Sequence, residues 1–204
     1  MSVENGRTIL IATSNRGKRA EFERLLPSTV RIVALDDLDV RVQMPAETGT
    51  SYAEIAATKA LAAAEQSGWL TVADDSGLEV DALDGAPGLR TARFAGEPPT
   101  DDRNRALLLS LLAVVSASRR TARFRCAVAL AEPGRVVAVT EGTCAGRIGT
   151  SEVGTRGFGY DPLFVLDDGR TMAELTDVEK DRVSHRGRAI RAMLPRLLAA
   201  LETR

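Results

Sequence analysis

Residues 8–26 read TILIATSNRGKRAEFERLL, and this stretch decides the fold class. Its first five residues, TILIA, are apolar and rich in β-branched side chains, which indicates a buried β-strand. A polar turn follows, and residues 18–26 then place Phe22, Leu25 and Leu26 at helical spacing before Pro27 ends the helix. A strand that passes directly into a helix predicts an α/β protein.

The same alternation of strand and helix continues along the chain. Further strands or extended segments are expected at residues 31–35, 70–73, 78–83, 122–130, 136–140 and 162–166. Further helices are expected at residues 52–67, 101–115 and 185–201. The capping pattern Ser51-x-x-Glu54 marks the start of the second helix. The Pro-Gly turn at residues 132–135 predicts a hairpin. Because a hairpin pairs its strands antiparallel, we expect a mixed central sheet.

Composition bounds the class of protein and its partners. The chain has 204 residues, of which 44% are hydrophobic and 27% charged, so residues 1–204 are expected to form a single globular domain. The net charge of -1 offers no basic field for nucleic acid or a membrane surface. The 2 cysteines cannot form a disulfide framework, and no apolar run approaches the roughly 20 residues that span a bilayer. We therefore expect a cytoplasmic protein without nucleic-acid or membrane partners.

The first polar cluster is the turn Thr13-Ser14-Asn15-Arg16-Gly17-Lys18, between the first strand and the first helix. Backbone N–H groups at a helix N-terminus attract anions, and the Lys18 ammonium adds a positive charge. The turn differs from a P-loop, because the first glycine and the hydroxyl residue after the lysine are missing. It predicts an anion-binding site, although an ordinary polar turn has the same composition.

The second cluster, Asp74-Asp75-Ser76-Gly77, is expected to follow a buried strand. Adjacent carboxylates on an extended chain point to opposite sides, so one can be structural while the other faces a site. Without a histidine cluster, the available ligands favour a hard ion such as Mg²⁺ or Mn²⁺. Glu47, in an acidic loop, is a candidate second ligand. A solvated turn is the alternative interpretation.

Two further clusters lie in the C-terminal half of the chain. Residues 157–162, GFGYDP, place aromatic rings between glycines, where a planar base can stack. Lys180 and the stretch Ser184-His185-Arg186 open a basic segment. The ordinary alternatives are aromatic rings that close the core and a solvated basic helix start.

In this order along one chain, these motifs resemble the inosine triphosphate pyrophosphatase family, whose members are also described as dITP/XTP pyrophosphatases. The resemblance covers nearly the whole chain and is most specific in DDSG, GFGYDP and SHRG. It implies an elongated α/β fold, with a central mixed β-sheet flanked by helices and two lobes with a substrate cleft between them. It also implies a homodimer, Mg²⁺, and hydrolysis of deaminated purine nucleoside triphosphates (ITP, dITP and XTP) to the monophosphate and pyrophosphate, which cleanses the nucleotide pool.

The resemblance also implies roles for single residues. Asp75 resembles the general base and a metal ligand, and Glu47 resembles a second metal ligand, a place that Asp74 could take instead. The residues that resemble substrate contacts are Thr13, Ser14, Asn15, Arg16, Gly17, Lys18, Lys59, Ser76, Phe158, Gly159, Tyr160, Asp161, Lys180, His185 and Arg186.

Two other functions fit the same residues. One is a pyrophosphatase of the same fold that acts on pyrimidine or modified nucleotides. The other is a non-catalytic module that binds a nucleotide or RNA through Phe158, Tyr160 and the basic segment. A binding module would need neither Asp75 nor Mg²⁺, so pyrophosphate release with and without Mg²⁺ separates it from an enzyme.

Overall fold

The computed structural model describes residues 7–203 and contains a six-stranded sheet with the strand order β2-β1-β3-β4-β5-β6. The strands are β1 (Thr8–Ile11), β2 (Arg31–Ala34), β3 (Thr71–Val80), β4 (Thr121–Glu132), β5 (Arg135–Ile148) and β6 (Phe164–Val165). The helices are α1 (Arg16–Leu25), α2 (Tyr52–Ser67), α3 (Asp101–Leu111), α4 (Asp177–Val183) and α5 (His185–Glu202). Strand β1 pairs parallel with β2 and β3, whereas β5 pairs antiparallel with β6. The predicted α/β class and mixed sheet are confirmed.

The chain divides into two compact units, each made of separate segments. Among the described residues, unit 1 comprises 7–75, 126–142 and 186–203, and unit 2 comprises 76–125 and 143–185. Each unit has its own apolar core. The single domain, the two lobes and the cleft stay predictions.

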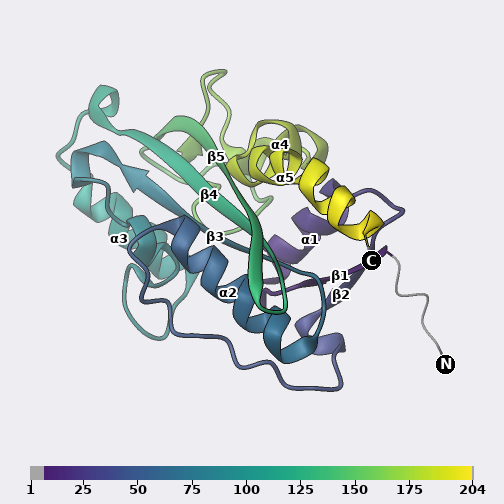
Figure 1. Cartoon of the computed structure of the whole chain (residues 1–204). Coiled ribbons are helices and arrows are strands. Elements are labelled where there is room, and N and C mark those ends of the chain that lie inside the picture. The colour runs from purple at the N-terminus through teal and green to yellow at the C-terminus, as the bar shows by residue number, and fades with distance from the viewer. Residues whose placement is uncertain (1–6, 204) are drawn as a thin grey trace. The chain divides into compact units, whose positions relative to one another are not determined.

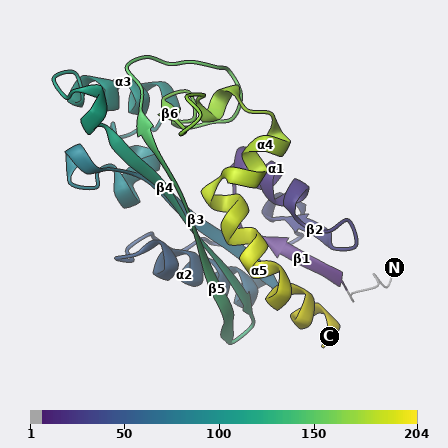
Figure 2. The same cartoon turned by 90° about the horizontal axis from the view of Figure 1, so that it is seen from above.

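In unit 1, side chains on the two faces of the sheet enter two different cores. On β1, Ile9 and Ile11 pack in one cluster with α1 and α5, while Leu10 packs in another with α2. Figures 1 and 2 show α2 on one side of these strands and α1 with α5 on the other. The face of α2 that packs on the sheet consists mainly of alanines, because small side chains let the helix approach the sheet closely. This two-sided burial explains why β1 is apolar throughout.

Local signals set most helix ends. Asn15 caps α1, and its side chain accepts from the Lys18 N–H. Ser51 caps α2 by accepting from the Glu54 N–H, while Glu54 turns to the N–H and hydroxyl of Thr50. The predicted capping box is thus half formed. Gly68 ends α2 with a φ of 77°, a left-handed conformation that glycine adopts at little cost.

The central strands are longer than the sequence predicts. DDSG does not follow a strand but lies inside β3, which runs without a break from Thr71 to Val80. The strand was expected to end before DDSG, and a solvated turn was the alternative interpretation, because Asp, Ser and Gly favour turns; burial of the strand outweighs that local preference. Strand β5 likewise extends to Ile148. Helix α3 is shorter and ends at Leu111, before two adjacent valines that disfavour a helix.

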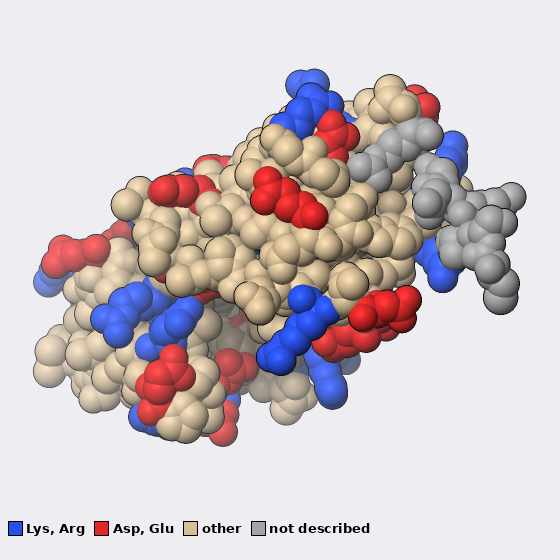
Figure 3. Space-filling view, turned by 60° about the horizontal axis from the view of Figure 1, so that its bottom comes forward, with Lys and Arg blue, Asp and Glu red and all other residues tan. Residues whose placement is uncertain are grey.

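The surface carries charges of both signs. In the face shown in Figure 3, lysines and arginines alternate in small groups with aspartates and glutamates, separated by uncharged surface. Across residues 7–203, no helix has the length and apolar character that crossing a membrane requires.

Candidate functional site

The adjacent carboxylates of β3 face opposite sides of the sheet. Asp74 pairs with cations from α1 and α5, whereas Asp75 pairs with Lys59 from α2. Both groups lie in unit 1. The alternation of side chains along an extended strand predicts this separation. The two residues of one dipeptide therefore occupy different chemical environments.

Asp74 lies at the centre of a buried ionic cluster. Its Oδ2 atom lies 3.0 Å from Lys18 Nζ and 3.1 Å from Arg186 Nε, and it accepts from the Cys126 thiol at 3.9 Å. Its Oδ1 atom is also buried and has no hydrogen-bond partner among the described residues. Burial raises the pKa of Asp74, but Lys18 and Arg186 outweigh burial and hold it well below its ordinary value. Asp74 is thus held in its charged form by the two cations.

Arg186 completes this cluster from α5. Its side chain is only 2% exposed and also pairs with Glu21 of α1. Sequence reasoning missed Glu21, although a signal was present. Glu21 follows Lys18 by three residues and precedes Leu25 by four, which places all three on one stripe of α1. Base recognition by Arg186 stays a prediction, because its described partners are two carboxylates.

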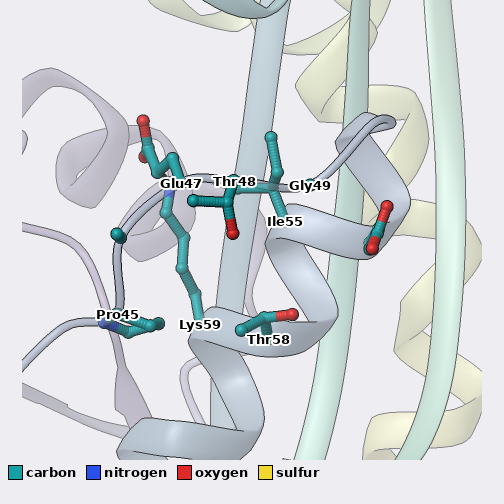
Figure 4. Close-up of a pocket in the computed structure, with 9 residues that line it drawn as sticks. Pro45, Glu47, Thr48, Gly49, Ile55, Thr58 and Lys59 are labelled. Atoms are coloured by element: carbon teal, nitrogen blue, oxygen red, sulfur yellow. Dashed lines mark ion pairs between the residues drawn. The ribbon is translucent and has the colours of Figure 1, made fainter.

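Asp75 and Glu47 converge on the ammonium group of Lys59. Lys59 Nζ donates to Asp75 Oδ1 at 3.2 Å and forms an ion pair with Glu47, which Figure 4 shows in the loop above α2. Burial raises the pKa of Asp75, and the lowering by Lys59 and Lys18 does not compensate. Burial lowers the pKa of Lys59, but Asp75 and Glu47 outweigh it, so the net pKa is raised. Asp75 is therefore more basic than an ordinary aspartate.

A pocket lies between residues 45–49 and the first turns of α2, and Glu47 and Lys59 line it. Gly49 lets the loop approach the helix, because a Cβ atom there would lie 2.8 Å from Ile55 Cγ1. The close approach keeps Glu47 beside Lys59. The pocket thus contains a carboxylate and an ammonium group side by side.

The predicted anion-binding turn leads from β1 into α1, also in unit 1. Ser14, Asn15 and Arg16 are exposed, and the first turn of α1 contains no acidic residue. Lys18 is mostly buried, with its ammonium on Asp74. An exposed helix start without acidic residues can accept an anion.

Residues 157–162, which we call the aromatic turn, lie in unit 2 together with Lys180. Lys180 Nζ lies 4.7 Å from the centre of the half-buried Phe158 ring and 2.5 Å from Asp161 Oδ2. The same oxygen accepts from the Phe158 N–H at 2.9 Å. Tyr160 is buried, and its hydroxyl donates to the Thr91 carbonyl at 2.9 Å. The structure brings Phe158, Asp161 and Lys180 together.

His185 and Ser76 also belong to unit 2. The His185 ring is buried and stacks on Phe124 with ring centres 4.7 Å apart and planes 13° apart. Phe124 was not among the predicted site residues, and only its place on a half-buried strand could have suggested it. Ser76 lies partly exposed in β3, next to Asp75.

Comparisons with known proteins identify the family. The sequence profile of the Ham1 family matches residues 9–196. A dITP/XTP pyrophosphatase of Desulforamulus reducens is 48% identical over 185 residues, which is 90% of this chain and 92% of that protein.

Two solved structures have the same fold. A Ham1 protein from Coxiella burnetii has a TM-score of 0.83 and 35% identity, and the match covers 95% of this chain and 99% of that one. A nucleoside-triphosphatase / dITP/XTP pyrophosphatase from Mycobacterium abscessus has a TM-score of 0.72 and 47% identity, covering 92% of this chain and 99% of that one.

Proposed function

This chain belongs to the Ham1 family, and from that premise we propose that it hydrolyses deaminated purine nucleoside triphosphates such as dITP, ITP and XTP. The products are the nucleoside monophosphate and pyrophosphate. The observation that carries the proposal is the contrast between two adjacent carboxylates of β3. Asp74 is paired with the buried cations of Lys18 and Arg186, whereas the pKa of Asp75 is raised beside Lys59 and Glu47. Relatives named as dITP/XTP pyrophosphatases support the same reaction.

Unit 1 supplies the phosphate chemistry. The N–H groups of residues 13–17 and the ammonium groups of Lys18 and Lys59 bind the triphosphate, whose negative charge they offset. Asp74 fixes Lys18 from the buried side, since the two groups lie 3.0 Å apart. A fixed cation stabilises the charge on the departing pyrophosphate without rearranging.

Asp75 acts as the general base. A water oxygen bonds to the α-phosphorus, the α–β bridging oxygen leaves with pyrophosphate, and the proton of the water passes to the Asp75 carboxylate. Its raised pKa favours this transfer, because a more basic carboxylate binds the proton more strongly. Lys59 holds the carboxylate in place through Oδ1.

The residues around Lys59 fit a magnesium ion. Asp75 and Glu47 already share a cation, and their hard oxygen atoms suit Mg²⁺. Among residues 7–203, no three His, Cys, Asp or Glu side chains gather into one metal site, and Mg²⁺ commonly completes its shell with water and substrate phosphates. When bound, Mg²⁺ would neutralise charge on the phosphate oxygens. Glu47 is favoured over Asp74 as the second ligand, because the Asp74 side chain is fully buried on Lys18 and Arg186.

We expect Glu47→Gln to raise the Mg²⁺ concentration for half-maximal activity by at least about tenfold. Loss of a group that supports a bound metal typically weakens metal affinity by about 10- to 100-fold. A neutral amide is a weaker Mg²⁺ ligand than a carboxylate. Activity is measured over a Mg²⁺ titration, with an EDTA blank. Glu54→Gln is the matched control, because Glu54 lines the same pocket but its carboxylate accepts from the Thr50 N–H. An unchanged Mg²⁺ requirement in Glu47→Gln contradicts the assignment.

Base recognition is assigned to the residues around Phe158. Phe158 offers an aromatic face, and Lys180 stands over it as a hydrogen-bond donor. His185 and Arg186 are the further predicted donors. Hypoxanthine and xanthine present an oxygen acceptor at position 6, whereas adenine presents an amino donor there, and neither Lys nor Arg can accept a hydrogen bond. This site therefore favours 6-oxopurines.

ITP and XTP are expected to exceed ATP in kcat/KM by at least about a hundredfold, since an adenine would leave buried donors unpaired. The measurement is steady-state pyrophosphate release from ITP, XTP, ATP and pyrimidine triphosphates. Equal values for ITP and ATP would refute the base-site assignment. A preference for a pyrimidine nucleotide would favour the second enzyme function, and tight binding without pyrophosphate release would favour the binding module. The resemblance also implies a homodimer, and sedimentation analysis of the purified protein tests that oligomeric state.

A further inference from the structure

Helix α3 binds the aromatic turn through both backbone polar groups of Gly159. The Gly159 N–H donates to Asp101 Oδ2 at 2.7 Å, and the Gly159 carbonyl accepts from Arg105 Nη1 at 2.9 Å. Asp101 and Arg105 are four residues apart on α3, so they lie on the same face. Both belong to unit 2, as does the turn. Two groups of one rigid helix thus fix both polar atoms of a single glycine.

Arg105 is itself held firmly. Its side chain is 13% exposed, its Nε lies 2.9 Å from Glu152 Oε1, and it also pairs with Asp102. A guanidinium with several carboxylate partners has few alternative positions. Arg105 can therefore hold the Gly159 carbonyl in place.

The residue before Gly159 is fixed as well. The Phe158 N–H donates to Asp161 Oδ2, which also binds Lys180. Gly157 makes this arrangement possible, because its φ is +76° and a Cβ atom there would lie 2.0 Å from Asp161 Oδ2. Glycines on both sides of Phe158 would otherwise leave the turn free to adopt many conformations. The contacts around the turn remove that freedom before any ligand binds.

We propose that Asp101 and Arg105 are positioning residues for base recognition. By fixing Gly159, they hold the Phe158 ring in the orientation that stacks on the base, so that binding does not have to order the turn. The proposal deepens the proposed function and rests on it. Because neither side chain belongs to the phosphate residues of unit 1, their loss should weaken base binding and leave the chemical step nearly unchanged.

The experiment compares three variants of the full-length enzyme. Asp101→Ala removes the acceptor for Gly159, and we expect KM for ITP to rise about tenfold while kcat stays within about threefold. Asp101→Asn keeps an oxygen acceptor at the same place, so its KM should return to within about twofold of the wild-type value. Glu97→Gln is the control: it removes a negative charge four residues before Asp101, from an exposed side chain that is not among the groups that hold Gly159 or Arg105.

A substrate without a base separates positioning from general damage. Ribose 5-triphosphate carries the same phosphates, so Asp101→Ala should leave its kinetics within about twofold of wild type. Equal losses with ITP and with ribose 5-triphosphate would overturn the proposal, as would an unchanged KM for ITP. If Asp101→Ala does not fold, Arg105→Lys replaces it, since lysine keeps the charge but loses the guanidinium contact to the Gly159 carbonyl. Its KM for ITP should also rise by about threefold or more.

Failure of the positioning proposal differs from failure of the proposed function. A wild-type enzyme that does not prefer ITP over ATP refutes the function, and the positioning role falls with it. A wild-type enzyme that prefers ITP, together with an Asp101→Ala variant that keeps the wild-type KM, refutes only the positioning role.

Discussion

Asp75→Asn is expected to lower kcat for ITP by at least about a hundredfold, or roughly 2.7 kcal/mol of transition-state stabilisation. The amide has nearly the same size as the carboxylate but cannot accept the proton of the attacking water and binds Mg²⁺ weakly. Stability should not fall, because burial already raises the pKa of Asp75 and thus disfavours its charged form in the fold. The neutral variant avoids that cost.

The measurements are kcat at saturating ITP and Mg²⁺ and the Tm from circular dichroism. Asp81→Asn is the matched control, because Asp81 directly follows β3 and pairs with the partly exposed Arg123. The control should keep wild-type kcat within about twofold. If Asp75→Asn retains more than about a tenth of wild-type kcat, a loss of barely 1.4 kcal/mol, Asp75 is neither the base nor an essential ligand.

Asp74→Asn, the same chemical change one residue earlier, is expected to act on stability. It leaves Lys18 and Arg186 beside a neutral amide, and breaking a buried ion pair costs about 3 kcal/mol or more. The pKa of Asp74 lies well below its ordinary value, so the folded state gains stability from the charged carboxylate, and the variant loses that gain. For a chain of this length, the Tm should fall by roughly 6–12 °C.

Calorimetric melting of the two adjacent Asp→Asn variants in the same buffer tests this contrast. Asp74→Asn should melt well below wild type, and Asp75→Asn should not. A Tm of Asp74→Asn within about 2 °C of wild type would show that the ionic cluster adds little to stability. Asp74→Leu is the second variant. Its Tm should lie below that of Asp74→Asn, because leucine offers the two buried cations no hydrogen-bond acceptor.

Local chemistry in the sequence determined several parts of the fold. The run from residue 8 to residue 26 specified β1, its turn and α1, because an apolar strand, an Asn cap and a terminal proline each act over a few residues. The start of α2 at Ser51 and its end at Gly68 follow from caps in the same way. The motif DDSG also predicted that its two carboxylates face opposite sides, because alternation is a property of any extended strand.

Contacts between distant segments decided the rest. Local preference predicted that the strand ends before DDSG, whereas pairing and burial continue β3 through it. Nothing near Asp74 in the sequence shows that it meets Lys18 and Arg186, because Arg186 lies 112 residues further along the chain. The bond between Asp101 and Gly159 likewise joins residues 58 apart. Such pairs form only when the cores bring helices and strands together. The sequence by itself therefore determined the residue types and local elements, and tertiary packing decided that Asp74 pairs with Lys18 and Arg186 whereas Asp75 pairs with Lys59.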